Sequence, residues 1–152
     1  MDNVQSVSCG NEHNAAIALD GTLYTWGKDT NGSLGLDLGS GSIVRQPQMV
    51  LGNVSSVCCL GNNTVAIADG NTLYAWGEDF GYSSPHKFAT GIVDVNRGCD
   101  STFILQNENS EVLLMQCIVS EDGTPAVHMT APVASNISEI TDYGYIRDDG
   151  TL

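Results

Sequence analysis

The chain has 152 residues and a formal net charge of −13, from 5 Lys and Arg against 18 Asp and Glu. So few cations exclude a surface that neutralises nucleic-acid phosphates, and we expect no nucleic-acid binding through this sequence. Charged residues make up 15% of the chain and hydrophobic residues 41%, which is typical of a folded chain and not of a charged disordered tail.

The first predicted element is a β-hairpin with its tight turn at Asp20-Gly21. Aspartate followed by glycine favours such a turn, because glycine readily adopts the positive φ that the turn needs. Side chains alternate along both arms of the hairpin, and we assign Ala16 and Leu23 to one face and Ile17 to the other.

The hairpin recurs 50 residues later, because the sequence of residues 17–27 is repeated in residues 67–77. The second copy places Gly70-Asn71 at the turn. A further strand is expected after each hairpin, around Pro47 and around Pro85. Self-similarity at a fixed spacing indicates a repeat protein and has to be interpreted before single motifs.

A third, weaker copy has predicted strands at residues 103–105 and 112–115, and Met115 stands in it where Trp26 and Trp76 stand in the first two. No segment shows an apolar stripe with helical spacing and caps, so helix should be nearly absent.

A partial fourth copy is predicted at the end of the chain, where residues 146–152 resemble residues 17–23. Residues 122–124 offer a rival Asp-Gly-Thr turn. A unit of this length cannot bury both its faces alone, so neighbouring sheets should stack radially. We therefore predict an all-β, partial β-propeller of about three to three and a half four-stranded antiparallel blades. The chain is read as one array over residues 1–152, with repeats at 4–53, 54–91, 92–136 and 137–152.

The repeated residues resemble the regulator of chromosome condensation repeat family. The positions that carry the resemblance, and that we assign to structural roles, are Cys9, Gly10, His13, Gly21, Tyr24, Trp26, Gly27, Cys59, Tyr74, Trp76 and Gly77. The resemblance implies a ring of seven blades, so this chain would supply about half of one. Either flanking blades or a homodimer would then close the ring and cover the exposed blade faces.

The resemblance also implies roles for single residues. His13 should be a structural histidine whose ring bonds neighbouring backbone, and Trp26 and Trp76 should lie between blades. Cys9 and Cys59 occupy equivalent positions and should act as small buried hydrophobic residues.

No catalytic, metal or cofactor site is predicted. His13, His86 and His128 fall in different parts of different repeats, which disfavours a shared metal. The segment 29–32 resembles a calcium loop only at its start and is interpreted as a turn. The adjacent carboxylates at 121–122 and 148–149 should point to opposite faces of an extended chain, so they are not acid and base partners.

Function is therefore expected to reside in loops, and the chain is interpreted as a non-enzymatic protein-binding scaffold. The loop residues predicted to be exposed and to contact a partner are Asp29, Asn31, Asp79, Phe80 and Tyr82. Acidic loops favour a basic partner. In the alternative interpretation, Phe80 and Tyr82 pack under their own loop.

The resemblance implies two further possibilities for function. The founding member of the family is a guanine-nucleotide exchange factor for a small nuclear GTPase, and other relatives inhibit enzymes. The first residues of the chain show neither a basic start nor an apolar stretch, and no run of residues is long and apolar enough for a spanning helix. We therefore expect an intracellular protein, cytoplasmic or nuclear, with no membrane partner.

Overall fold

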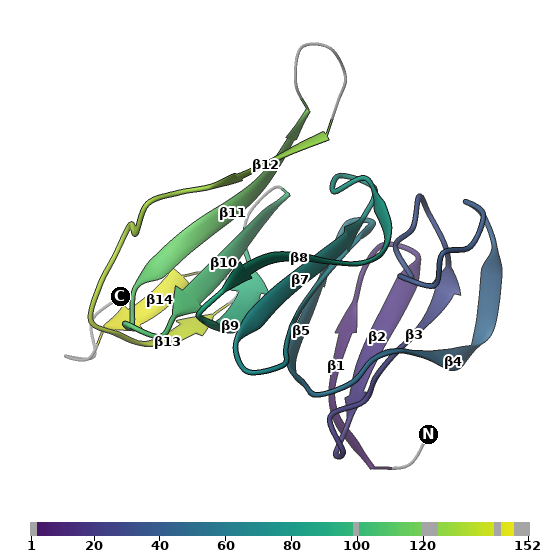
Figure 1. The fold of residues 1–152 in the computed structure, drawn as a ribbon, viewed down its shortest axis with the longest axis horizontal. Helices are drawn as coiled ribbons and strands as arrows, with labels where there is room; N and C mark the ends of the chain where they lie inside the picture. Colours follow the sequence, from purple (N-terminus) through teal and green to yellow (C-terminus); the bar gives the residue numbers. More distant parts are fainter. Residues whose placement is uncertain (1–2, 99–100, 120–124, 142–143, 148–152) are drawn as a thin grey trace.

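The computed structural model describes residues 3–98, 101–119, 125–141 and 144–147. Within these ranges the chain forms strands and turns but no helix, as predicted. Three four-stranded antiparallel sheets and one two-stranded sheet follow one another along the chain. Figure 1 shows the sheets fanned out side by side in sequence order, which is the arrangement of propeller blades. The predicted all-β partial propeller is confirmed.

Each four-stranded sheet is a meander of consecutive strands, and we call the three sheets blades one, two and three. Blade one contains β1 (Val4–Cys9), β2 (His13–Ala18), β3 (Leu23–Lys28) and β4 (Ile43–Leu51). Blade two contains β5 (Val54–Leu60), β6 (Asn63–Ala68), β7 (Thr72–Gly77) and β8 (Tyr82–Thr90). Blade three contains β9 (Ile92–Arg97), β10 (Thr102–Asn107), β11 (Val112–Val119) and β12 (Pro125–Met129). The two-stranded sheet contains β13 (Ile137–Thr141) and β14 (Gly144–Arg147).

The hairpin turns use the residues that the sequence indicates. Gly21 has a φ of 79°, and Gly70 and Asn71 have φ values of 70° and 69°. These angles lie in the left-handed region, which glycine and asparagine enter at the lowest cost. The predicted turns at Asp20-Gly21 and Gly70-Asn71 are therefore confirmed.

The predicted assignment of faces across the first hairpin is wrong by one residue. Ile17 pairs with Leu23, so these two side chains share a face, and Ala16 pairs with Tyr24 on the other. The amide of Ala18 donates to the carbonyl of Thr22, so an odd number of residues lies between Ile17 and its partner Leu23. This register places Leu23 on the opposite face from the predicted one. Alternation within each arm is as expected; only the register between the arms differs.

The core lies between blades, as radial stacking requires. Blade one contributes Ala15, Ile17 and Leu23 to its contact with blade two, where they meet Val54 and Trp76. The opposite face of blade two meets blade three in a second cluster that is rich in aliphatic and aromatic side chains. Blade two is thus covered on both faces, and every residue of its strand β6 is buried.

Trp76 lies between blades as predicted, and none of its surface is exposed. Trp26, the equivalent residue of blade one, is only half-buried, and the prediction that it also lies between blades is wrong for this structure. Cys9 is exposed for the same reason, whereas its equivalent Cys59 is buried. Their face of blade one has no neighbouring blade among the described residues.

The last predicted repeat is described in part. β13 and β14 pair as a hairpin, and Ile137 and Ile140 pack against Ile104 and Val112 of blade three. Of the predicted echo of the first hairpin at 146–152, residues 148–152 lie outside the described residues, and so does the rival turn at 122–124. The repeat boundaries themselves stay a prediction. No helix among the described residues is long and apolar enough to cross a membrane.

Candidate protein-binding surface

The longest connection between strands of one blade, residues 29–42, joins β3 to β4 and is organised from within by Asp29. One carboxylate oxygen of Asp29 accepts a bond from the amide of Leu34 at 2.9 Å, and its backbone pairs with Gly41 and Ser42. Asp29 is 0% exposed, and this burial raises the pKa of its carboxyl group. The prediction that Asp29 is exposed is therefore wrong, because its carboxylate holds its own loop together.

Phe80 is also buried, with 5% of its surface exposed. Its ring lies 5.4 Å from that of Phe88 and 6.1 Å from that of Phe103, so it belongs to the core between blades two and three. Its predicted exposure is wrong. The ring enters the space between two blades, where it packs against aromatic side chains of both.

Asn31 is exposed and connects blade one to blade two. Its side-chain amide donates to Glu78 at 2.9 Å, and Ser40 of the same loop donates to its amide oxygen at 2.9 Å. Glu78 also accepts a bond of 2.7 Å from Asn62. The carboxylate of Glu78 is therefore fixed by two amides and has no cation partner among the described residues.

The two other predicted contact residues lie on blade two. Asp79 is half-buried and accepts a 2.7 Å bond from Asn63. Tyr82 is 39% exposed, and its ring stacks on that of His86 with centroids 3.8 Å apart and planes 3° from parallel. A partner-binding role for Asn31, Asp79 and Tyr82 stays a prediction.

The loop of blade one and the start of β8 form one continuous surface. Ser83 donates a 2.5 Å bond to the carboxylate of Asp37, and the amide of Asp37 donates to the carbonyl of Ser83 at 2.9 Å. Gly32 packs so closely on this segment that a Cβ atom there would lie 2.6 Å from the Cα of Ser83. We call residues 29–42 and 78–83 together the loop surface.

A buried network lies beneath the loop surface and joins blades one and two. His13 Nε2 lies 2.8 Å from the hydroxyl of Thr64, and that hydroxyl donates to the carbonyl of Ser33 at 2.9 Å. The indole Nε1 of Trp76 donates to the same carbonyl at 3.1 Å. His13 is structural, as expected, but its ring bonds a side chain of the next blade and not neighbouring backbone.

Sequence reasoning missed Glu78 and Glu12. Glu12 lies in the connection between β1 and β2, where Lys28 donates to it at 2.8 Å, and this bond lowers the pKa of its carboxyl group. Glu78 could have been found from the repeat, since it follows Trp76-Gly77 as Lys28 follows Trp26-Gly27. Within the described ranges, no group of three or more His, Cys, Asp and Glu side chains is placed to hold a metal ion.

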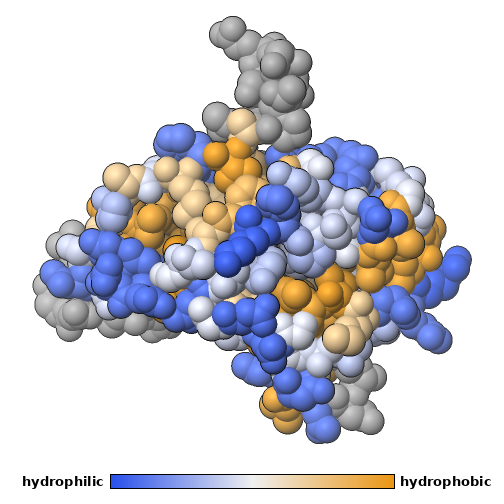
Figure 2. Space-filling model, in the orientation of Figure 1, coloured by the Kyte–Doolittle hydropathy of each residue, from blue (hydrophilic) through white to orange (hydrophobic). Residues whose placement is uncertain are grey.

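Large apolar side chains gather on the exposed parts of blade one. They are Val4, Val7, Leu19, Leu38, Ile43 and Met49. Figure 2 shows apolar surface over this part of the molecule, surrounded by hydrophilic residues. The face of blade two that is equivalent to the open face of blade one is buried against blade one. Exposed apolar side chains on a sheet face are expected where a neighbouring element can pack.

The sequence matches a known repeat. The profile described as the Regulator of chromosome condensation (RCC1) repeat matches residues 20–67, and a second profile of the same repeat matches residues 4–33. A stretch of 33 residues is 54% identical to the human probable E3 ubiquitin-protein ligase HERC3, and covers 22% of this chain and 3% of that protein.

Solved structures of similar fold cover most of the chain. Human WBSCR16 has a TM-score of 0.67 at 19% identity, over 84% of this chain and 38% of its own. Prp20p of Saccharomyces cerevisiae, described with its binding to Gsp1p and histones, has a TM-score of 0.71 at 16% identity, over 94% and 42%. The structure of Kap60 bound to yeast RCC1 (Prp20) gives 0.68 at 12%, over 97% and 42%.

This chain spans about two fifths of the solved chains that it resembles. At these identities the likeness establishes the fold, while the sequence profiles establish the type of repeat. Residues 4–67 therefore match regulator of chromosome condensation repeats, and the described sheets are arranged as blades of a β-propeller.

Proposed function

We propose that the chain is a non-enzymatic protein-binding propeller that presents the loop surface to a basic partner protein. The observation that carries this proposal is the fixed carboxylate of Glu78, which the amides of Asn31 and Asn62 hold at the junction of two blades. A preorganised carboxylate without a cation of its own is suited to receive a lysine or arginine. Tyr82 and the acidic side chain of Asp37 extend the same surface.

The net charge of the chain supports the same partner chemistry. A charge of −13 repels acidic proteins and speeds the approach of basic ones. Prp20p was described with its binding to histones and to the small GTPase Gsp1p, so purified histones are a suitable first probe.

Binding of purified core histones to the immobilised chain tests this proposal. We expect an affinity that falls steeply as salt rises, and a loss of about tenfold when Glu78→Gln removes the charge but keeps the shape. Glu108→Gln is the matched control, because Glu108 is an exposed carboxylate in the β10–β11 turn of blade three, away from the loop surface. Equal losses in the two variants would exclude the loop surface as the binding site.

A second candidate function is nucleotide exchange on a small GTPase, favoured by the structural similarity to yeast RCC1 (Prp20). Release of fluorescent mant-GDP from a panel of purified small GTPases measures it directly. Acceleration at micromolar concentrations of the chain would support exchange, and unchanged release from every GTPase would reject it. Inhibition of an enzyme, as in some relatives, stays a further prediction.

We also propose that the described residues belong to one repeat array in which a further blade covers the open face of blade one. Val7 is 66% exposed there and Trp26 is half-buried, whereas Trp76 is completely covered by blade one. The covering blade comes either from flanking sequence or from a second copy of the chain.

Sedimentation at several protein concentrations distinguishes these two sources. A concentration-dependent dimer supports coverage by a second copy, and Val7→Asp should then return it to monomer, because the substitution places a charge on the apolar face. A strict monomer at all concentrations excludes the dimer and leaves flanking sequence as the source.

A further inference from the structure

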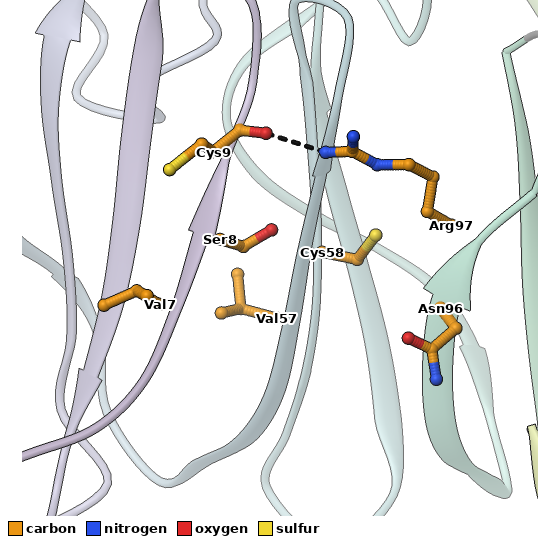
Figure 3. A pocket seen from close by; sticks show the side chains of 7 residues that line it. All are labelled: Val7, Ser8, Cys9, Val57, Cys58, Asn96 and Arg97. Carbon is orange, nitrogen blue, oxygen red and sulfur yellow. Dashed lines mark hydrogen bonds between the residues drawn. The ribbon is translucent and has the colours of Figure 1, made fainter. Parts of the chain in front are cut away.

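Two kinds of side chain bond blade one to the other blades. On the first strands of the blades, Arg97 donates to the backbone carbonyls of Cys9 and Cys59 at 2.8 Å and 2.7 Å, and Figure 3 shows the first of these bonds. On the loop surface, the side-chain amide of Asn31 donates to Glu78 at 2.9 Å. A guanidinium group is stable in neutral water. An asparagine amide, in contrast, can be lost by deamidation.

The sequence at Asn31 is the one that deamidates most readily. Asn31 is the only asparagine in the chain that precedes a glycine. In such a pair the backbone nitrogen of the glycine can attack the side-chain carbonyl carbon of the asparagine, because glycine has no side chain to hinder the approach. Asn31 is also exposed, so water reaches its amide.

The reaction needs no reagent other than water. The nitrogen of Gly32 forms a bond to Cγ of Asn31, the Cγ–Nδ2 bond breaks, and ammonia leaves with the proton that the Gly32 amide gives up. Water then opens the resulting five-membered imide. Attack at Cγ gives aspartate, and attack at the backbone carbonyl carbon gives isoaspartate.

The structure fixes both groups that must meet in this reaction. Glu78 accepts from Nδ2 of Asn31, while the hydroxyl of Ser40 donates to its Oδ1 at 2.9 Å and accepts from its backbone amide at 3.1 Å. Gly32 is buried with a φ of 87°, and a Cβ atom there would lie 2.6 Å from the Cα of Ser83. Ring closure therefore requires residues 29–42 to separate from residues 78–83.

We propose that Asn31 is a deamidation site that the closed loop surface protects and that separation of residues 29–42 from residues 78–83 makes reactive. Conversion to aspartate replaces the donor that faces Glu78 by a second carboxylate, so attraction becomes repulsion. Isoaspartate adds a methylene group to the backbone next to Gly32, where there is no room for a Cβ atom. Either product leaves the two segments less able to close again.

Peptide mass spectrometry of the whole chain tests the site and its protection. The chain is incubated at mildly alkaline pH, folded in buffer and unfolded in urea, and the conversion of Asn31 is followed with time. We expect conversion to be at least about tenfold slower in the folded chain, because only the opened state reacts. No conversion in urea would overturn the site, and equal rates in the two conditions would overturn the protection.

Variants then test the role of Glu78. Glu78→Ala should speed conversion in the folded chain by at least about threefold, because the bond that holds Nδ2 is lost. Glu108→Ala is the matched control, since Glu108 of blade three accepts the same kind of bond from Asn71 of blade two, at 2.8 Å. Equal rates in the two variants would overturn the role of Glu78. The mass readout is independent of histone binding, so the two proposals can fail separately.

The effect of the modification is measured on Asn31→Asp, which is one of the two products. The amide of Asp37 donates to the carbonyl of Ser83 at 2.9 Å, so its hydrogen exchange reports separation of the two segments. We expect exchange at least about threefold faster than in the unmodified chain. Adding Glu78→Gln should reverse this, because it removes the repulsion and supplies a donor. Unchanged exchange in Asn31→Asp, or no reversal, would overturn the proposed effect.

Discussion

His13 is held neutral by its surroundings. The hydroxyl proton of Thr64 is directed at the carbonyl of Ser33, so this hydroxyl can only accept from the imidazole, and Nε2 must carry the hydrogen. Nδ1 is buried and has no partner among the described residues. Burial lowers the pKa of His13 to about 4, because a second proton would place an unpaired charge between the blades.

The stability of the chain should therefore depend on pH through His13. The pKa falls from 6.5 in the unfolded chain to about 4 in the folded one, so the unfolded state binds more protons between these values. Stability is complete above pH 6.5 and is lost as the pH falls towards 4, by up to about 3 kcal/mol. Urea unfolding at pH 7, 5.5 and 4.5 measures this loss.

His13→Asn supplies the control for this titration, because blade two carries Asn63 at the same repeat position. The variant should be less stable than the unmodified chain at pH 7, and the difference between the two should shrink as the pH falls. A difference that stays constant from pH 7 to 4.5 would contradict the assignment of the titration to His13.

At the scale of elements, the loop 29–42 is shaped by its contact with the next blade. Leu34 and Gly35 of this loop are buried, and a Cβ atom on Gly35 would lie 2.7 Å from the indole Nε1 of Trp76. The end of the loop next to β4 is different, since a Cβ atom on Gly41 would meet nothing within 4 Å. The same loop is therefore tightly packed in its middle, at Gly35, and open around Gly41.

These two glycines make a matched pair, because both have positive φ, at 71° for Gly35 and 90° for Gly41. Replacement of either by alanine strains the backbone by about 1 kcal/mol. Gly35→Ala should cost about 2 kcal/mol more, because the indole of Trp76 must move and lose its bond to Ser33. Thermal unfolding measures both, and equal costs would show that Trp76 does not restrict the loop.

The elements could be predicted from the sequence because they repeat. Two copies of the same alternating pattern indicated hairpins, and the tight turns at Gly21 and Gly70 followed from residue type alone. The pairing register between the arms could not be predicted, because a turn that is one residue longer leaves the sequence pattern unchanged and inverts the faces.

The candidate site was harder to predict than the fold. Asp29 and Phe80 lie in connections between strands, where side chains are usually exposed. The carboxylate of Asp29, however, bonds its own loop, and the ring of Phe80 enters the space between two blades. Burial of this kind depends on the neighbouring blade, which lies far away in sequence. Arg97 was missed for the same reason, because its partners are the backbone carbonyls of two other blades.

At the scale of the whole molecule, the difference in burial between Trp76 and Trp26 shows which blade has a neighbour on the face that carries its tryptophan. Blade one covers Trp76, whereas no blade among the described residues covers Trp26. Trp76→Phe should cost about 2 kcal/mol through the lost bond to Ser33 and a poorer fit, and Trp26→Phe should cost less than half as much. Urea unfolding of the two variants tests this difference.

The same comparison tests for the missing neighbour. If a second copy or flanking sequence supplies the covering blade, the cost of Trp26→Phe should rise towards that of Trp76→Phe in the assembled protein. Equal costs in this chain as a monomer would contradict the view that the outer face of blade one is open.

The bonds between blades also predict which positions tolerate sequence change. At each junction a side chain donates to a backbone carbonyl: Trp76 to Ser33, Arg97 to Cys9 and Cys59, and Gln106 to Ile137. A carbonyl persists whatever side chain its residue carries, so mutational tolerance should be asymmetric across every junction. The bond restricts each donor position to a few residue types, whereas at an acceptor position only the packing of the side chain restricts the residue, so the bonds between blades persist while acceptor positions change in sequence.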